Sequence, residues 1–581
     1  MILIFGGTTE GRLAAEVCDL AGKPYWYSTK SEGEGVAMRH GTHISGARDA
    51  EAIRSFCLTN GVRCIVDAAH PFASSLHRAI EAQGIPVVRL ERKFPPPLSW
   101  ATYCDSLEDA LERLLARPAK LLLCLSGAST IGKLTPYWHE HPSLFRILPR
   151  PESLGEAQRQ GFPKDRLLFY GKRLPTTEEE TRLMADTGCD AVLTKESGES
   201  GGFTEKAEAA KRLGIDLFVI KRPKLPSNWT YVDGRHTLRL ALERIVPDFF
   251  PLRTGLTTGS CATAATKAAL LSLLRGTRPE RVTITLPDGE SVCIETKTEG
   301  EGFASVRKGF SDDPDVTRGC LVWAKVRLRT DGQVRFLRGE GVGRVTLPGL
   351  GIAVGEPAIN TVPRRMMESE IRTLTERGAD VTIGVEGGEE LAKRTFNPRL
   401  GIEGGISIVG TLGIVSPLSN EAFILSLRRE LEVAEATGCR EIAFVSGKRS
   451  EDAVRQRLGL RCVHCVNLIG EALKAAYSMR CFRKVVVGVM IGKAVKLAAG
   501  RLDTHSKSSA IDTAFLRSVA RECGTKAEPQ GGWQSLHFAR ELWQCMPPAF
   551  FERIRELCLQ ACRRVYPDGE LEIMLVCEQE A

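Results

Sequence analysis

The chain lacks long apolar segments: in its 581 residues, no run approaches the roughly 20 apolar residues that a membrane-spanning helix needs. Its first residues, Met1-Ile-Leu-Ile-Phe5, lack the basic start and the small-residue cleavage site of a signal peptide. Aromatic residues make up only 6%, and no basic stripe with interleaved aromatic side chains is present. From these absences we expect a cytoplasmic protein with neither a membrane nor a nucleic-acid partner.

Compact catalytic motifs are also missing. The sequence has no H-E-x-x-H metal pattern and no serine, histidine and aspartate in the order of a known hydrolase. Its 18 cysteines are scattered, which is typical of reduced thiols when no secretion signal is present. Cys462 and Cys465 form one close pair, but a single C-x-x-C is weak evidence for a metal. We therefore expect no metal cofactor.

The length and the charge of the chain indicate several domains and a small ligand. At ~150 residues per domain, the chain would form about four structural units. The net charge of +8 is spread over short clusters such as Arg364-Arg365 and is not gathered in a tail. This balance suits a small polyanionic substrate, although a solvated surface is the ordinary explanation of scattered charge.

Residues 1–247 alternate short apolar strands with helices. We expect strands at Ile2–Phe5, Cys64–Ala69, Val87–Leu90, Leu121–Leu125, Leu167–Tyr170, Ala191–Thr194 and Leu217–Ile220. Strands separated by helices of this length predict parallel α/β sheets. The Pro-rich segment Phe94–Leu98 predicts a connection between two such lobes, which we expect to split near residues 94–118.

A helix at Leu238–Arg244 is followed by Pro247 and Pro251, which predict a short linker. We place the main boundary there, between domains 1–247 and 248–581. Beyond it, residues 282–346 are β-rich, and strands and helices alternate again from about residue 365. The predicted fold class is multidomain α/β and α+β, with two Rossmann-like parallel-sheet lobes followed by an α+β lobe and an α/β lobe.

A glycine turn, Gly6-Gly-Thr-Thr-Glu-Gly11-Arg12, follows the first strand and leads into a helix. Gly6 and Gly11 match the outer glycines of G-x-G-x-x-G, but the middle glycine is displaced to position 7. Backbone N–H groups of such a turn can meet a phosphate, although close helix packing requires glycine as well. The cofactor-binding candidates from this turn are Gly6, Gly7, Thr8, Gly11 and Arg12.

Two further polar loops follow strand ends, where ligands of open α/β sheets bind. The loop Asp67-Ala-Ala-His-Pro-Phe-Ala73 offers Asp67 and His70 for substrate binding, and His70 for relaying a proton. A histidine that only fixes the loop before Pro71 fits the pattern equally well. The loop Thr194-Lys-Glu-Ser-Gly-Glu-Ser-Gly-Gly202 offers four cofactor-binding candidates: Thr194, Lys195, Ser197 and Gly198.

Over about residues 1–246, these loops resemble those of precorrin-6A reductases, including the cobalt-precorrin-6A reductases. The matching residues are Gly6-Gly-Thr-x-Glu-Gly-Arg12, Asp67-Ala-x-His-Pro-Phe-Ala73, Thr194-Lys-x-Ser-Gly198 and Arg222-Pro223. The resemblance implies a nicotinamide cofactor, NADPH or NADH, held between two α/β lobes, and reduction of one C=C bond of a macrocycle. Lys195 and His70 become catalytic candidates that orient or supply the proton. Glu196 and Ala69 depart from the family, which commonly has asparagine and threonine there.

The second half opens with a similar polar turn. Thr257, Thr258, Gly259 and Ser260 lead into an alanine-rich helix, and N–H groups at a helix start can receive an anion. An ordinary capped, buried helix is the alternative. Five glycines in residues 401–413 imply close approach to a ligand or to another strand.

Two further segments of this half hold candidate residues. Lys493 lies near a helix start that follows the strand Val485–Met490, and Asp503-Thr-His-Ser506 offers His505 as a catalytic candidate.

Nearly all of this half resembles cobalt-precorrin-5B C1-methyltransferases. The match runs from Arg253-Thr-Gly-x-Thr-Thr-Gly259 through Asn397-Pro-Arg-Leu-Gly401 to Thr504-His-Ser506, and Met490 departs from a frequent histidine. The resemblance implies S-adenosylmethionine as methyl donor, which we expect at Thr257–Ser260. Guanidinium groups bind carboxylates bidentately, so we expect the acidic macrocycle to contact Arg253, Arg364, Arg399 and also Lys493.

The predicted function is a bifunctional enzyme of cobalamin biosynthesis that first methylates C1 of cobalt-precorrin-5B and then reduces cobalt-precorrin-6A to cobalt-precorrin-6B. Cobalt enters only as part of the substrate. Two alternatives stay open at this point: a tetrapyrrole carrier without catalysis, and an NAD(P)-dependent reductase of another substrate fused to an unrelated transferase. The sequence leaves undecided the choice between NADH and NADPH, self-association into a homo-oligomer, and direct transfer of intermediate between the halves.

Overall fold

The computed structural model describes residues 1–30, 36–171, 173–313, 315–415, 420–505, 511–536 and 538–577. The chain forms two compact units. The first unit comprises Met1–Arg253 together with Glu290–Val292, and the second comprises Thr254–Gly289 and Cys293–Ala581. Each unit contains two lobes, which we number in chain order: lobe 1 (residues 1–90 and 230–245), lobe 2 (102–220), lobe 3 (254–415) and lobe 4 (420–577).

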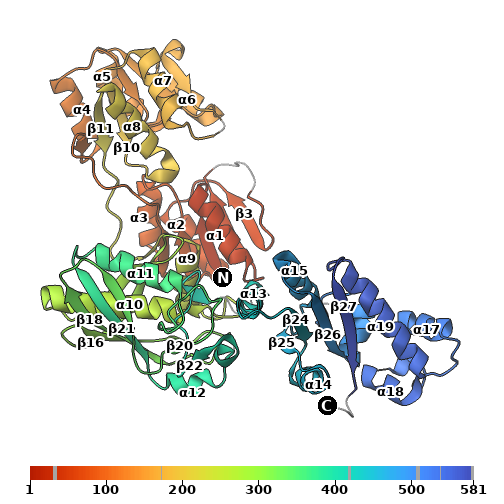
Figure 1. The fold of residues 1–581 in the computed structure, drawn as a ribbon. Helices are drawn as coiled ribbons and strands as arrows, with labels where there is room; N and C mark the ends of the chain where they lie inside the picture. The colour runs from red at the N-terminus through yellow and green to blue at the C-terminus, as the bar shows by residue number, and fades with distance from the viewer. Residues whose placement is uncertain are drawn as a thin grey trace. The chain divides into compact units, whose positions relative to one another are not determined.

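Lobe 1 is a parallel sheet with helices on both faces (Figure 1). The strand order is β12 (Thr230–Val232), β5 (Val87–Leu90), β4 (Cys64–Asp67), β1 (Ile2–Phe5), β2 (Tyr25–Thr29) and β3 (Gly41–Ser45). The helices are α1 (Thr9–Asp19), α2 (Ala50–Thr59), α3 (Ser74–Glu81) and α9 (Arg235–Ile245). One apolar cluster joins α1 and α9 to the sheet, and another joins α2 and α3. All four residues of β1 are buried, as expected for a strand covered on both faces.

Lobe 2 repeats this plan with the strand order β6 (Thr102–Cys104), β11 (Asp216–Ile220), β10 (Ala191–Lys195), β7 (Leu122–Cys124), β8 (Ser143–Ile147) and β9 (Leu167–Phe169). Its helices are α4 (Leu107–Ala116), α5 (Thr135–Trp138), α6 (Pro151–Arg159), α7 (Thr177–Thr187) and α8 (Phe203–Leu213). The chain crosses between the lobes twice, at residues 91–101 and 221–229. Because β12 and α9 return to lobe 1, lobe 2 is an insertion within lobe 1, which the sequence did not indicate.

Lobe 3 is built around α10 (Thr258–Arg275). This helix packs on a five-stranded mixed sheet of order β16 (Lys297–Gly300), β17 (Phe303–Arg307), β18 (Leu321–Arg329), β21 (Gly378–Val385) and β19 (Val334–Arg338). Helix α11 (Thr361–Arg372) packs beside it, and α12 (Gly388–Ala392) follows β21. Short pairs complete the lobe: β13 (Gly255–Leu256) with β23 (Ile414–Val415), β14 (Arg281–Thr285) with β15 (Ser291–Glu295), and β20 (Arg344–Val345) with β22 (Ile402–Glu403).

Small side chains explain the central place of α10. It is buried on nearly every side from Thr258 to Ala269, and a helix can be enclosed in this way only when neighbouring backbones approach closely. Two of its buried hydroxyls are satisfied inside the helix, because Thr263 and Thr266 donate to the carbonyls of Gly259 and Ala262.

Lobe 4 is a parallel sheet of order β25 (Arg461–His464), β24 (Glu441–Val445), β26 (Lys484–Met490) and β27 (Glu570–Val576). Its helices are α13 (Asn420–Ala436), α14 (Lys448–Leu458), α15 (Ile469–Met479), α16 (Ile491–Ala498), α17 (Thr513–Glu522), α18 (Leu542–Cys545) and α19 (Pro548–Arg563). One large apolar cluster joins most of these helices to the sheet. The predicted fold class is therefore confirmed.

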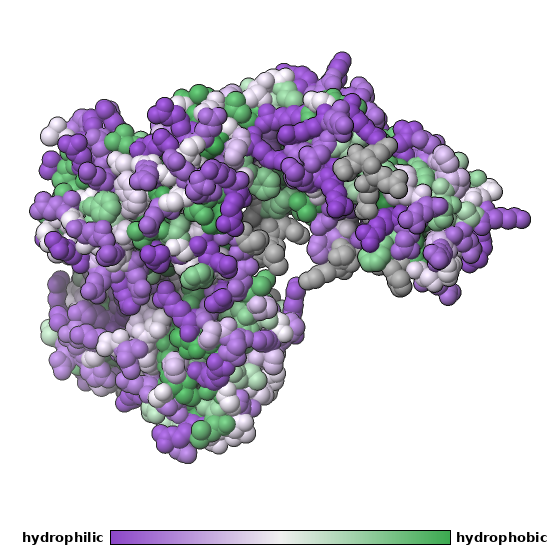
Figure 2. Space-filling view, turned by 90° about the horizontal axis from the view of Figure 1, so that it is seen from below, coloured by the Kyte–Doolittle hydropathy of each residue, from purple (hydrophilic) through white to green (hydrophobic). Residues whose placement is uncertain are grey.

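Hydrophilic residues cover much of the face seen in Figure 2, with hydrophobic residues in small groups between them. Within the described ranges, no helix is both long enough and apolar enough to cross a membrane.

Candidate functional site

The turn Gly6–Arg12 joins β1 to α1, and its glycines pack closely against Tyr27 of β2. A Cβ on Gly6 would lie 2.3 Å from the ring of Tyr27, and one on Gly11 would lie 2.7 Å from the Cα of Gly6. The N–H of Gly7 donates to the Tyr27 hydroxyl at 3.0 Å. Gly6 and Gly11 thus serve the close packing of helix on strand, the second reason that the sequence pattern offered for glycine here.

Thr8 connects this turn to the next loop. Its hydroxyl caps α1 by accepting the N–H of Gly11 at 3.0 Å, and it donates to the carbonyl of Ala68 at 2.6 Å. The exposed side chain of Arg12 lies at the same end of the helix.

Asp67 ends β4 and is completely buried. Its carboxylate accepts a hydrogen bond from Arg89 Nη1 at 2.8 Å and one from the N–H of Ala69 at 3.2 Å, and His77 Nε2 lies 3.4 Å away. Asp67, which the sequence suggests for substrate binding, is thus occupied by partners from its own lobe in this structure. It instead fixes the loop that presents His70.

His70 projects from that loop and is exposed. Its Nδ1 accepts the N–H of Phe72 at 3.2 Å, which leaves Nε2 to carry the proton of the neutral ring. Desolvation by the surrounding protein and the positive charges of Arg92 and Lys195 lower the pKa of His70 to about 4. His70 is thus neutral near pH 7 and can donate a hydrogen bond from Nε2.

Lys195 ends β10 in lobe 2, and its ammonium lies 5.3 Å from the centre of the Phe72 ring of lobe 1. Burial, with a smaller contribution from Lys133, lowers the pKa of Lys195 to about 8. The two predicted catalytic residues, 125 positions apart in the sequence, thus both lie next to Phe72: the His70 ring is 5.9 Å from the Phe72 ring centre and the Lys195 ammonium 5.3 Å.

A polar network ties the same loops together across the two lobes. Arg92, whose side chain is almost fully buried, forms an ion pair with Glu10 at 3.1 Å and donates to the carbonyl of Ser197 at 3.0 Å. Ser200 donates to Glu10 at 2.5 Å. Against the effect of burial, the hydrogen bond from Ser200 and the charge of Arg92 lower the pKa of Glu10. We call Glu10, His70, Arg92, Lys195 and Ser200 the interlobe cluster.

No sequence motif marks Arg92, Glu10 or Ser200 as site residues. Arg92 lies in the crossing between lobes, where no local motif marks it, and Glu10 and Ser200 were only parts of glycine-rich loops. Ser197 and Gly198, two other predicted residues of the loop 194–202, make contacts within the protein. Ser197 is buried and donates to the carbonyl of Gly201 at 3.2 Å, and a Cβ on Gly198 would meet the carbonyl of Lys93 at 2.9 Å.

Thr194 is buried at the end of β10. Its hydroxyl has no hydrogen-bond partner among the residues that the structure describes.

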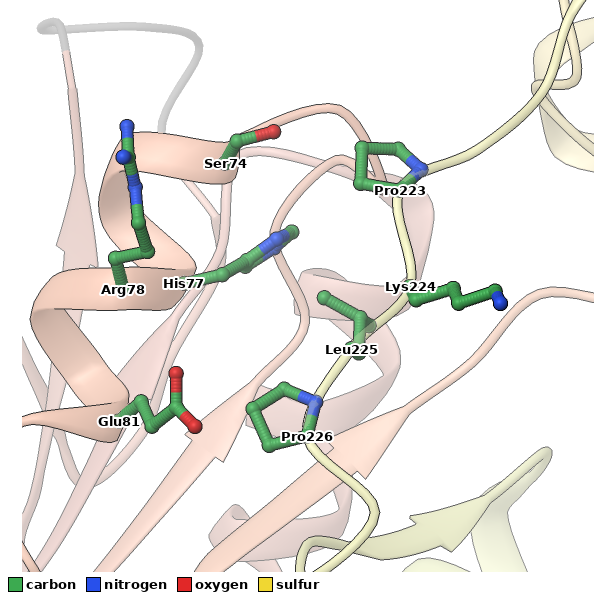
Figure 3. A pocket seen from close by; sticks show the side chains of 8 residues that line it. All are labelled: Ser74, His77, Arg78, Glu81, Pro223, Lys224, Leu225 and Pro226. Atoms are coloured by element: carbon green, nitrogen blue, oxygen red, sulfur yellow. The ribbon is translucent and has the colours of Figure 1, made fainter. Parts of the chain in front are cut away.

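A cavity of about 340 Å³ lies between α3 and the second crossing (Figure 3). His77 of α3 points from the helix toward Pro223 and Leu225 of the crossing. Its side chain is buried, and neither ring nitrogen has a hydrogen-bond partner among the described residues. The cavity thus adjoins the buried ion pair of Asp67 that supports the His70 loop.

In the second unit, the turn Thr257–Ser260 is buried and engaged with lobe 3 itself. The N–H of Gly259 donates to the carbonyl of Val409 at 2.9 Å, and Ser260 N–H donates to Thr257 Oγ1 at 3.1 Å. Ser260 Oγ donates to the carbonyl of Gly413 at 2.7 Å, and Thr258 Oγ1 accepts the N–H of Val409 at 3.0 Å. The 407–413 segment therefore occupies these groups in this structure, as in the capped, buried helix that the sequence left open as the alternative.

The glycines of residues 401–413 serve the same packing. A Cβ on Gly405 would lie 2.4 Å from the carbonyl of Gly341, and one on Gly410 would lie 2.2 Å from Thr257 Oγ1. Their close approach is therefore to other segments of lobe 3, which was one of the two explanations that the sequence left open.

The predicted arginines differ in their surroundings. Arg364 is turned toward its own segment, donating to the carbonyls of Ile359 at 2.8 Å and Pro357 at 3.1 Å, and cannot reach a ligand without breaking these bonds. Arg253 is exposed at the start of the turn. Arg399 lines a cavity at the junction of lobes 3 and 4.

Lys493 lies in the first turn of α16, at the carboxyl edge of the lobe 4 sheet. Its ammonium donates to the carbonyl of Val466 at 2.6 Å and approaches that of Ser446 at 3.5 Å. Val466 follows β25 and Ser446 follows β24, so Lys493 lies at the ends of β24 and β26. From β24 the chain continues to β25 on one side of the sheet and then to β26 on the other, which makes this position the switch point of the sheet. Such switch points bind ligands in open α/β sheets. Burial lowers the pKa of Lys493.

His505 is exposed beside this edge, and its N–H donates to Asp503 at 2.9 Å. Thr504 is buried and donates to the carbonyl of Asn467 at 3.3 Å, while Ser506 of the same motif lies outside the described residues. Cys462 and Cys465 are both buried, and burial raises the pKa of Cys465 to about 12. This pair therefore has the character of packing thiols.

Comparisons with known proteins divide the chain in the same way. The family model for "Precorrin-6x reductase CbiJ/CobK" matches residues 1–242, and that for "CbiD" matches residues 247–417. The cobalt-precorrin-5B C(1)-methyltransferase of Prosthecochloris aestuarii is 42% identical over 349 residues, which are 57% of this chain and 95% of that protein. The protein of the same name from Pseudomonas paraeruginosa is 44% identical over 330 residues, covering 54% and 88%.

The chain belongs to the cobalt-precorrin-5B C(1)-methyltransferase family. With its reductase match over residues 1–242, it is a fusion of two enzymes, a methyltransferase and a precorrin-6 reductase, of cobalamin biosynthesis. The predicted recognition, function and enzyme activities are thereby confirmed. The two families use a nicotinamide and a methyl donor of the S-adenosylmethionine type, and act on tetrapyrrole precursors.

Two solved structures are also similar. A structure titled "CobK precorrin-6A reductase" has 22% sequence identity and a TM-score of 0.36, and the match covers 42% of this chain and 97% of that one. The cobalamin biosynthesis protein (cbiD) from Archaeoglobus fulgidus has 30% identity and a TM-score of 0.26, with coverage of 47% and 84%.

Proposed function

We propose that the second half transfers a methyl group from S-adenosylmethionine to C1 of cobalt-precorrin-5B, and that the first half reduces the resulting cobalt-precorrin-6A with NADPH or NADH. The first product is then the second substrate, which accounts for the fusion of the two activities. We further propose domain limits of 1–247 and 248–581. The observation that best supports the reductase assignment is the interlobe cluster, which gathers His70, Lys195 and Arg92 at one place.

The residues around the cluster fit a nicotinamide cofactor. The turn Gly6–Arg12 and the loop Thr194–Gly198 lie at the carboxyl ends of β1 and β10, where ligands of such sheets bind. Exposed Arg12 suits a cofactor phosphate, and the unpartnered hydroxyl of Thr194 can accept or donate one more hydrogen bond. The cofactor, when bound, supplies the hydride for the macrocycle carbon.

The chain itself must supply the proton that completes the C=C reduction. Lys195, with a pKa of about 8, is mostly protonated near pH 7 and is acidic enough to give up that proton. His70 is neutral there and cannot deliver a proton as imidazolium, but its Nε2–H can orient the macrocycle. Lys195 is therefore the proposed proton donor and His70 the proposed orienting group. Glu10 and Arg92 hold the two loops in place.

Methyl transfer requires mainly alignment, because the sulfonium is already activated and leaves as a neutral thioether. Holding two reactants in line can supply roughly 7–11 kcal/mol of the barrier reduction. Since the Thr257–Ser260 turn is occupied by its own lobe, we propose that the carboxyl edge of lobe 4 receives the reactants. Lys493 there binds a carboxylate, and His505 beside it is the proposed catalytic candidate.

The experiment that tests this function incubates the purified full-length protein with cobalt-precorrin-5B and S-adenosylmethionine, and then adds NADPH or NADH. We expect the mass to rise by one methyl group in the first step and by two hydrogens in the second. A protein that methylates without reducing, or reduces supplied cobalt-precorrin-6A without methylating, would restrict the proposal to one half. Comparing initial rates with the two nicotinamides identifies the preferred one.

A further inference from the structure

A cavity of about 220 Å³ lies in the second unit, where the turn Asn397–Leu400 of lobe 3 meets the outer strand β25 of lobe 4. Three guanidinium groups line it. Arg399 comes from the turn, Arg455 from α14 and Arg461 from the start of β25. Glu430 of α13 lines it as well.

A buried carboxylate holds this cluster in place. Glu451 of α14 lies 2.5 Å from Arg399 Nη2, 2.7 Å from Arg455 Nη2 and 2.9 Å from His464 Nε2. Against the effect of burial, the hydrogen bonds from Arg399 and His464 lower the pKa of Glu451. One ionised carboxylate thus fixes groups from two lobes.

Two polar atoms of the wall remain without protein partners. Arg399 Nη1 is buried and makes no hydrogen bond with any described residue, and the same is true of Glu430 Oε1. The Glu430 side chain is almost completely enclosed, and its other oxygen accepts the N–H of His464 at 3.2 Å. Buried polar groups nearly always have partners, so these two atoms mark positions where a ligand would complete the hydrogen bonding.

The charge balance indicates the sign of that ligand. Three guanidinium groups stand against the two carboxyl groups of Glu451 and Glu430, and burial raises the pKa of Glu430. The wall is therefore net positive. A guanidinium presents paired N–H donors that match the two oxygens of a carboxylate.

The position of the cavity connects it with the methyl-transfer site. His464 ends β25 and Glu451 lies in the first turn of α14, so the cluster adjoins the carboxyl edge of lobe 4 that also contains Lys493. Arg399 extends from the motif Asn397-Pro-Arg-Leu-Gly401, which belongs to lobe 3.

We propose that this cavity binds one carboxylate arm of the tetrapyrrole substrate, with Arg399 and Arg461 as its main contacts, and so positions the macrocycle at the carboxyl edge of lobe 4. The proposal rests on the methyl-transfer function proposed for this half. It adds a location for the substrate and a role for residues of lobe 4 that no motif marked.

The test uses the full-length protein and two tetrapyrrole probes. Uroporphyrin carries acetate and propionate arms, whereas coproporphyrin carries propionate arms only, and binding of both is followed by their fluorescence. We expect Arg399→Gln and Arg461→Gln to weaken uroporphyrin binding about tenfold or more, as for a lost charged hydrogen bond. Loss for both probes identifies a propionate arm, and loss for uroporphyrin alone identifies an acetate arm. Unchanged binding of both probes overturns the proposal.

Arg394→Gln is the matched control, because Arg394 is an exposed residue of the same segment and does not line the cavity. It removes the same charge and should change binding by less than about twofold. Thermal unfolding and an unchanged KM for S-adenosylmethionine report whether the second unit of each variant is folded. Arg399→Lys keeps the charge without the paired donors, so a partial loss of affinity is expected from it.

Kinetics separate this proposal from the function on which it rests. Arg399→Gln should raise the KM for cobalt-precorrin-5B about tenfold while the KM for S-adenosylmethionine stays the same. If the wild-type protein methylates and the variant keeps its KM, the cavity is only a structural ion cluster. If the wild-type protein itself fails to methylate, the proposed function of this half fails instead.

Discussion

The turn Gly6–Arg12 of the reductase half and the turn Thr257–Ser260 of the methyltransferase half have similar sequences: polar, glycine-bearing and leading into a helix. In the structure, the first lies at the edge of a parallel sheet, and Thr8 and Glu10 link it to the His70 loop and to lobe 2. The second is enclosed by the 407–413 segment, which takes up its N–H and hydroxyl groups. The same local pattern thus forms part of a candidate site in one half and part of the core in the other.

The difference arises from the helix that each turn leads into. The helix α1 after Gly6–Arg12 has an exposed face with Arg12 and Glu16, so the end of the helix stays near solvent. The helix α10 after Thr257–Ser260 is rich in alanine and threonine and is buried on nearly every side. A helix start can receive an anion only where the surrounding structure leaves its N–H groups accessible.

The largest effect should come from Gly259→Val. A Cβ at this position would lie 2.7 Å from Pro363 Cγ and 3.0 Å from the carbonyl of Val409. The extra methyl groups would have to displace α11 or the 407–413 segment, and overpacking of a core costs about 1–3 kcal/mol or more. We expect methylation to be lost and the thermal unfolding of the second unit to shift downward, while NAD(P)H-dependent reduction persists.

Gly300→Val is the matched control, because nothing lies within 4 Å of a Cβ there. A Gly259→Val protein that unfolds normally but does not methylate would instead identify the turn as a ligand site, like the turn Gly6–Arg12 of the reductase half.

Lys195→Ala should lower the rate of cobalt-precorrin-6A reduction without affecting methylation. Loss of a general acid costs about 10²–10⁴-fold in rate. Because the ammonium form donates the proton, the wild-type rate of reduction should fall as the pH rises through about 8, and the variant should lack this pH dependence. The measurement is a pH profile of single-turnover reduction of supplied cobalt-precorrin-6A. A profile that is the same in both proteins would remove Lys195 from proton transfer.

Arg92→Gln tests whether the interlobe cluster positions the two loops of the reductase. Its partners Glu10 and Ser197 belong to different lobes, so the variant should loosen their alignment and raise the KM for the nicotinamide by about tenfold, as for a broken charged hydrogen bond. Lys93→Gln, a change of the exposed neighbour, should leave the KM close to that of wild type. Equal KM values for the two variants would mean that the network is not needed for cofactor binding.

The smallest effect is expected from separating the halves. Fragments 1–247 and 248–581 should each fold and keep their own activity, because each half has its own sheets and apolar clusters. The assay compares the rates of the two steps for the fragments and the full chain. Loss of both activities in folded fragments would show that each half needs the other for its activity.

Much of the fold could be predicted from local patterns. Strands such as Ile2–Phe5 and Val87–Leu90 were expected with the observed limits, because continuous apolar runs between helices are typical of buried parallel strands. The return of β12 and α9 to lobe 1 could not be predicted, since nothing in Thr230–Val232 specifies which of two parallel sheets it joins. Strand pairing at this distance depends on the whole core.

Local motifs marked some residues of the candidate sites but not their partners. Lys195 and His70 stood out because polar loops at strand ends are where ligands of α/β sheets bind. Asp67 was assigned to the substrate from the same pattern, and only the structure revealed Arg89, which neutralises it in the interior. Arg461 and Glu430 had no motif around them at all.

By itself the sequence determined the fold class, the two enzyme families and the loops at the strand ends, because these depend on hydrophobic periodicity and on residues close together in the chain. Only the tertiary structure decided which polar groups are satisfied internally and which face a cavity. That decision rests on contacts between distant segments, such as Thr257–Ser260 with residues 407–413 and Arg399 with Glu451. A buried hydrogen bond uses up a donor wherever its partner lies in the sequence, and no local pattern records that partner.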